Sequence, residues 1–95
     1  MAKDMVMEGD YKGKGVMLYL DGIHIMAGIR ISKHVLVNKD TIEKYEVIDK
    51  GYDKPGIFSD DNREYTIAVK FKDGKSCIMQ VGQRIYLFLV QMFLD

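Results

Sequence analysis

The chain is poor in residues that cross-link or stiffen a small domain. It has one cysteine, Cys77, one proline and no tryptophan. A single cysteine excludes an internal disulfide, and small secreted domains usually depend on such bonds, so a cytoplasmic location is expected. The two histidines and Cys77 show no spacing typical of metal ligands, and no metal or cofactor is predicted.

The chain also lacks an excess of charge of either sign. Fourteen basic and fourteen acidic side chains give a formal net charge of zero. A general nucleic-acid binder normally needs a basic excess to displace counterions, so this class is set aside. Copies of a nearly neutral chain repel each other little, which permits self-association.

Long hydrophobic runs are absent as well. No segment reaches the roughly 18 consecutive apolar residues that span a bilayer, and the first five residues do not resemble a secretory signal. Apolar residues make up 47% of the chain and charged residues 29%, a balance typical of a folded globular protein. Residues 1–95 are therefore predicted to form one domain without a membrane span.

Two Asp-Gly pairs lie between apolar runs. The first follows Val16–Leu20 and precedes Ile23–Ala27. The second is within Lys72–Lys75, between the alternating run Tyr65–Phe71 and Ser76–Val81. Asp-Gly between strands predicts a hairpin, with type I′ geometry when both central residues have positive φ.

Further strands are predicted on either side of the first hairpin. Val6 and Met7 are expected to begin an edge strand. Beyond Gly28, residues 29–37 are expected to be strand with a bulge or kink near Ser32 and Lys33. Thr41–Asp49 alternates apolar and charged residues, which predicts a strand with one face in water.

The last segment favours a helix. After Gly82, residues 83–94 contain no turn signal and no period-2 alternation. Apolar side chains surround almost the whole circumference, more than one small sheet covers, and a large exposed apolar patch usually marks an interface. We expect the helix to pack on its own sheet and on a second copy, through Tyr86, Leu87, Val90, Phe93 and Leu94. The alternative is a sheet that curls around the helix.

A long turn-rich loop over residues 50–63 is the best candidate for a ligand or partner site, because long loops on a rigid sheet often carry function. Its aromatic and cationic side chains suit an anionic or planar ligand or a protein partner. A plain surface connection is the alternative. The candidate residues are Lys50, Tyr52, Lys54, Phe58 and Arg63, with a weaker basic cluster at Arg30, Lys33 and His34.

No motif predicts catalysis. His24, between Ile23 and Ile25, is expected to be an exposed strand histidine, and Cys77 a small buried hydrophobe. Gly13–Gly15 lacks the remainder of a phosphate-binding loop, and Asp60–Glu64 lacks the spacing of a calcium loop. The chain is therefore not expected to be an enzyme.

The order of elements carries one resemblance. An early hairpin, the strand Thr41–Ile48, the Tyr65–Val81 hairpin with the phrase Val69–Lys75, and a terminal helix follow one another over residues 16–94. In this order the chain resembles small bacterial and phage proteins with a pleckstrin-homology-like fold. The resemblance implies an α+β domain, a curled antiparallel half-barrel of about five to seven strands with one C-terminal helix. It also implies an interaction module, although it transfers no binding residue.

Two functions are therefore expected, neither enzymatic. The first is a binding module that self-associates through its C-terminal helix. The alternative is a phage- or mobile-element-type protein that sequesters an anionic small molecule, such as a signalling nucleotide, at a subunit interface. The sequence names neither the ligand nor the number of subunits.

Overall fold

The computed structural model describes residues 4–50 and 64–94. Within this part the fold is α+β, with antiparallel strands and a C-terminal helix, as the sequence predicted. The elements are β1 (Met5–Gly9), β2 (Val16–Tyr19), β3 (Gly22–Ile25), a 3₁₀ turn (Ile31–Lys33), β4 (Val35–Val37), β5 (Ile42–Asp49), β6 (Tyr65–Phe71), β7 (Ser76–Val81) and α1 (Gln83–Met92).

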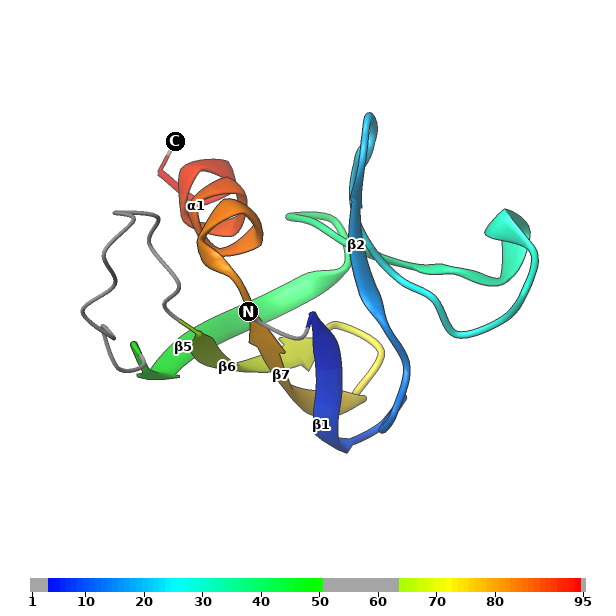
Figure 1. Ribbon diagram of the computed structural model, residues 1–95, viewed down its shortest axis with the longest axis horizontal. Helices are drawn as coiled ribbons and strands as arrows, with labels where there is room; N and C mark the ends of the chain where they lie inside the picture. Colours follow the sequence, from blue (N-terminus) through cyan, green and yellow to red (C-terminus); the bar gives the residue numbers. More distant parts are fainter. Residues whose placement is uncertain (1–3, 51–63, 95) are drawn as a thin grey trace, which may run out of the picture.

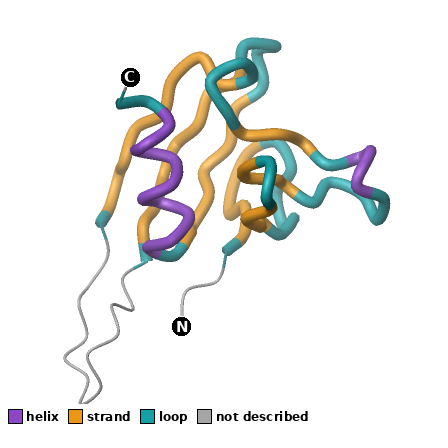
Figure 2. Tube along the Cα trace, turned by 90° about the horizontal axis from the view of Figure 1, so that it is seen from above, coloured by secondary structure: helices purple, strands orange, loops and turns teal. Residues whose placement is uncertain are grey.

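The strands form two separate sheets. The larger has the order β1-β7-β6-β5 and the smaller the order β2-β3-β4. Figure 1 shows α1 and the three-stranded sheet on the same side of the four-stranded sheet. Seen from above, α1 runs over the larger sheet while the smaller one stands beside it (Figure 2). The two sheets are not closed into a barrel.

The core lies between these layers. Strand β6 shows the alternation expected of a half-covered sheet, since Tyr65, Ile67, Val69 and Phe71 are buried while Lys70 is exposed. Ile23 and Ile25 of β3 and Leu89 of α1 belong to the same buried cluster. Within residues 4–50 and 64–94, no helix or strand covers the opposite face of the four-stranded sheet (Figure 1).

Helix α1 packs through one side only. Ile85 and Leu89 are buried, and Tyr86, Met92 and Phe93 pack partly buried against the core. The amide of Gly82, where the helix begins, donates a hydrogen bond of 2.8 Å to Asp4 Oδ1 beside β1. Aromatic contacts add to this packing: the Tyr86 ring stacks on Tyr65, and the Phe93 ring lies 5.0 Å from that of Tyr45.

The second hairpin has the expected loop. Lys70 pairs with Ser76, and the Phe71 amide donates to the carbonyl of Lys75 at 2.8 Å. Gly74 has a φ of 95°, as expected when a three-residue loop ends in the left-handed region.

The first hairpin is confirmed, but its type I′ turn is wrong. Tyr19 pairs with Gly22, so the two loop residues are Leu20 and Asp21 instead of Asp21 and Gly22. Neither has positive φ, because Tyr11 is the one non-glycine residue of the described part in that region. Gly22 itself has a φ of 129°, so the residue with positive φ lies just after the loop.

The strand expected over residues 29–37 is partly wrong. Only Val35–Val37 is strand, and Ile31–Lys33 forms a 3₁₀ turn that begins after three bent residues. Ile29 is fully exposed, so the apolar residue that suggested a strand has no sheet to pack on. The remaining predictions of strands at Val6–Met7 and at residues 41–49, and of a helix after Gly82, are confirmed.

Candidate functional site

A cleft of about 570 Å³ lies on the face of the four-stranded sheet that faces away from α1. Its volume is in the range of pockets that bind small molecules. The register of β5, β6, β7 and β1 arranges its side chains in two neighbouring rows that run across the strands. Rows two residues apart along a strand are separated by about 6.7 Å. We call this feature the sheet cleft.

The first row is cationic. Lys44 of β5 lies opposite Lys70 of β6, and Lys70 lies opposite Ser76 of β7. Lys70 Nζ is 3.7 Å from a carboxylate oxygen of Glu43, a half-exposed ion pair that contributes little. Like charges placed directly opposite each other on adjacent strands are destabilising. This end of the sheet cleft therefore favours an anionic group.

The second row has an apolar centre with an acid at each end. Ala68 and Ile78 are half-buried neighbours on β6 and β7. Glu46 lies opposite Ala68 on the edge strand β5, and Glu8 lies opposite Ile78 on the edge strand β1. The floor of the sheet cleft is thus apolar, and the carboxylates beside it accept hydrogen bonds from donors on a ligand.

Gly9 of β1 lines the cleft at the edge of the sheet. It has a φ of 85° and pairs with Cys77. A Cβ atom at this position would lie 2.6 Å from the backbone oxygen of Ser76. Only glycine allows β1 to approach β7 this closely with this conformation.

Cys77, which contributes to the lining of the cleft, is buried and unpaired, as expected. Burial, together with the nearby carboxylate of Asp10, raises the pKa of its thiol to about 11. The thiol is therefore protonated at neutral pH, which makes it a poor nucleophile and a poor metal ligand.

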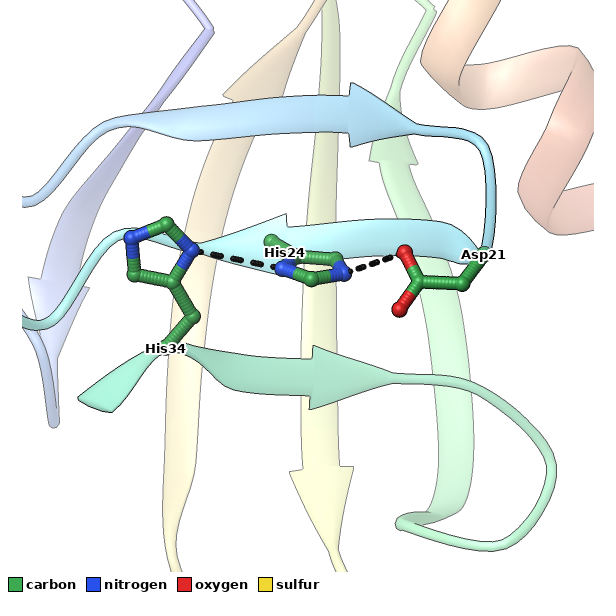
Figure 3. Close-up of polar contacts among 3 residues, drawn as sticks. All are labelled: Asp21, His24 and His34. Atoms are coloured by element: carbon green, nitrogen blue, oxygen red, sulfur yellow. Dashed lines mark hydrogen bonds and ion pairs between the residues drawn. The ribbon is translucent and has the colours of Figure 1, made fainter. Parts of the chain in front are cut away.

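A second cluster lies on the outer side of the three-stranded sheet and contains both histidines of the chain. Figure 3 shows Asp21, His24 and His34 in a line. His24 Nε2 is 2.7 Å from Asp21 Oδ1, and His24 Nδ1 is 3.3 Å from His34 Nδ1. The Tyr19 ring packs on both, with its centroid 4.4 Å from that of His24 and 5.7 Å from that of His34.

The prediction that His24 is exposed is wrong, because His24 is only 3% exposed. Its alternation with Ile23 and Ile25 does turn it away from the core. It is nevertheless covered, since Met17 and Leu36 flank it on the neighbouring strands and the rings of Tyr19 and His34 lie against it.

The hydrogen bonds set the protonation pattern of the neutral histidines. An ionised carboxylate only accepts hydrogen bonds, so Asp21 requires the proton of neutral His24 to be on Nε2. His24 Nδ1 then carries a lone pair and accepts the N–H of His34 Nδ1. Asp21 therefore orients the lone pair of His24 toward His34.

Most of the predicted loop site lies outside the described residues: this holds for Tyr52, Lys54, Phe58 and Arg63. Lys50 is described and exposed at the end of β5. In the second basic cluster, Arg30 and Lys33 are exposed, while His34 is half-buried against His24.

The predicted helix interface divides into two groups. Leu87 and Leu94 are 52% and 75% exposed, together with Phe88 at 37%. Tyr86, Val90 and Phe93 are half-buried. The exposed apolar side of α1 is therefore narrower than the sequence indicates.

Sequence reasoning missed both the sheet cleft and the histidine pair. The cleft requires β1 to lie beside β7, a pairing between residues near opposite ends of the described chain. The histidine pair requires the β3–β4 register, in which His24 lies opposite Leu36 and His34 precedes it by two residues on the same face. The sequence signal for the histidine pair was limited to the two short apolar runs, Ile23–Ile25 and Val35–Val37, which pair as strands next to the histidines.

Comparison with known protein families, with curated proteins and with solved structures found no match. Within the described residues, no helix is long and apolar enough to cross a membrane. That part of the chain also holds no group of three or more histidine, cysteine or acidic side chains placed to bind a metal ion.

Proposed function

We propose that this chain is a non-enzymatic binding module that takes a small amphipathic ligand with one anionic group into the sheet cleft. The observation that carries the proposal is the cross-strand pair Lys44 and Lys70 at one end of an otherwise apolar floor. Their repulsion is relieved when an anionic group lies between the two ammonium groups.

The second row of the cleft narrows the ligand class. An apolar or aromatic body fits over Ala68 and Ile78, beside the anionic group. Glu8 and Glu46 repel additional negative charge there and favour hydrogen-bond donors on the ligand. The cleft therefore suits a molecule with a single anionic end better than a polyanion.

Binding of adenosine monophosphate, indole-3-acetate and their neutral counterparts adenosine and indole-3-acetamide tests this proposal by NMR. We expect the anionic member of each pair to shift the amides of Lys44, Lys70 and Ser76 and to bind more tightly. Replacing both lysines by glutamine (K44Q/K70Q) should weaken binding at least about tenfold, the effect of roughly 1.4 kcal/mol. The double variant K12Q/K72Q, which removes two charges at exposed positions outside the cleft, is the matched control.

Two outcomes would reject the cleft as the site. One is the absence of amide shifts at millimolar concentrations of all four probes. The other is equal weakening by K44Q/K70Q and by K12Q/K72Q, since this indicates a general charge effect.

Self-association through α1 is a second candidate, and the exposed Leu87, Phe88 and Leu94 favour it. A second copy is the proposed occupant of this side, because the zero net charge of the chain permits close approach. Sedimentation should give a dimer or larger species that Leu87→Glu dissociates. Ser32→Glu adds the same charge at an exposed position of the 3₁₀ turn, outside α1, and should leave the assembly intact.

The half-barrel, pleckstrin-homology-like arrangement belongs to the same proposal, as do a cytoplasmic location and a bacterial or phage origin. A four-stranded antiparallel sheet with a terminal helix on one face supports the first of these. The cleft faces away from α1, so ligand binding and self-association through the helix use different sides of the domain.

A further inference from the structure

The facing nitrogens of His24 and His34 have the separation of two ligands on one metal ion. Their Nδ1 atoms are 3.3 Å apart. Two nitrogens that each lie about 2.0–2.1 Å from a tetrahedral zinc ion are about 3.3–3.4 Å apart. In the metal-free chain this pair forms the hydrogen bond described above, and His34 Nδ1 gives up its proton when it becomes a ligand.

An ion bound to both nitrogens lies to one side of the line that joins them. The two rings are almost perpendicular, at 88°, so a rotation of one ring brings its lone pair toward such a position. His34 is the ring that can turn, because it is half-buried and follows a short 3₁₀ turn. His24 is held by Asp21 and by burial.

Asp21 supplies the support that metal-binding histidines commonly have. A histidine that binds a metal through one nitrogen usually donates its other N–H to a carboxylate, which orients the ring and makes the ligand nitrogen more basic. His24 Nε2 makes this bond to Asp21 Oδ1 at 2.7 Å. Its Nδ1 is thereby kept free of a proton and directed at His34.

We propose that His24 and His34 bind one divalent transition-metal ion of the zinc class through their Nδ1 atoms. Imidazole nitrogen suits zinc, copper, nickel and cobalt, whereas magnesium and calcium prefer oxygen ligands. The described residues provide no third protein ligand, so the ion keeps coordination positions for water or for an incoming donor. The site is distinct from the sheet cleft, since none of its residues lines that cleft.

Calorimetry with Zn²⁺ and absorption spectroscopy with Co²⁺ test this proposal on the full chain. We expect one ion per chain and a ¹⁵N NMR shift of the Nδ1 atoms of both histidines. His34→Gln removes one ligand at a half-exposed position and should lower the zinc affinity at least tenfold. Lys33→Gln, next to it and fully outside the cluster, should leave the affinity unchanged.

Asp21→Asn tests whether Asp21 orients the His24 ring or binds the metal ion directly. Loss of the carboxylate should weaken zinc binding about 10- to 100-fold while one ion per chain is still bound. The circular-dichroism spectrum and the unfolding midpoint without metal establish that each variant folds.

The proposal is overturned if millimolar Zn²⁺ and Co²⁺ do not bind, or if folded His34→Gln binds zinc as tightly as the unaltered chain. It is also overturned if zinc binds without shifting the histidine Nδ1 signals, since the ion is then held elsewhere in the chain.

Discussion

The rings of Tyr65 and Tyr86 stack with their centroids 3.9 Å apart and their planes within 2° of parallel. Tyr65 is the first residue of β6 and Tyr86 lies in the first half of α1. Tyr65 belongs to the buried core, and Tyr86 packs partly buried against it. The contact therefore joins the helix to the sheet at the edge of the core.

A double-mutant cycle measures that contact. With Tyr65→Leu, Tyr86→Leu and the double variant, the coupling free energy should be about 0.5–1.5 kcal/mol, the value typical of aromatic pairs beyond their buried area. Urea unfolding gives the four stabilities. Additivity within about 0.3 kcal/mol would show that the stacking itself contributes nothing.

Two leucines of α1 should respond very differently to truncation. Leu89 is fully buried, so Leu89→Ala should lower the free energy of unfolding by about 2–5 kcal/mol through lost burial and the remaining cavity. Leu87 is half-exposed, and Leu87→Ala should change it by less than about 1 kcal/mol. These values apply to dilute monomer, and thermal or urea unfolding checks them. Similar losses for both variants would contradict the side of the helix assigned to the core.

Gly9 and Gly13 form a matched pair for testing the close approach of β1 to β7. Both have positive φ, 85° and 84°, but a Cβ at Gly9 meets the Ser76 carbonyl at 2.6 Å and one at Gly13 meets nothing within 4 Å. Gly13→Ala should cost about 1–2 kcal/mol from backbone conformation alone. Gly9→Ala should cost clearly more, on the order of 3 kcal/mol. Equal costs in urea unfolding would argue against the contact.

The buried thiol of Cys77 makes stability depend on pH in the alkaline range. Burial raises the pKa of Cys77 from an ordinary value of 9.0 to about 11. The unfolded chain therefore loses this proton first, so the stabilisation is complete below about pH 9 and is lost as pH rises toward 11. The total loss is at most about 3 kcal/mol.

Unfolding of the unaltered chain and of Cys77→Ala at several pH values tests this dependence. The difference in stability between the two should shrink as pH rises through that window, because only the cysteine chain carries the thiol. The folded thiol should also react slowly with thiol reagents at about pH 8, where it is protonated. A constant difference, or fast labelling without unfolding, would contradict the raised pKa.

The local pattern of the sequence was sufficient for most strands and for the helix. Alternation from Tyr65 to Phe71, the turn at Gly74 and the break at Gly82 each depend on neighbours in the sequence, and each was predicted. The turn type at Asp21 was not, because the register of β2 and β3 moves the loop by one residue.

The candidate sites depend on contacts between distant residues, which a single sequence does not reveal. Lys44, Lys70 and Ser76 meet only through the order of the sheet. His24 is buried because its neighbouring strands bring Met17, Leu36 and the rings of Tyr19 and His34 against it. The local pattern of residues therefore predicted the class of fold correctly and misjudged the exposure of His24.

The pairing of β1 with β7 has a consequence for synthesis of the chain. One edge of β1 bonds to residues 13–16, which follow it closely in the chain. Its other edge gains its partner only when Ser76–Val81 has left the ribosome, because β7 is its neighbour in the four-stranded sheet. The Asp4 carboxylate likewise accepts its hydrogen bond from Gly82 only after that residue has been synthesised. Until then the edge of β1 that faces β7 is unpaired, and the nascent domain exposes a strand edge that other chains can bind. Folding of the four-stranded sheet is thus completed after translation of almost all the residues described.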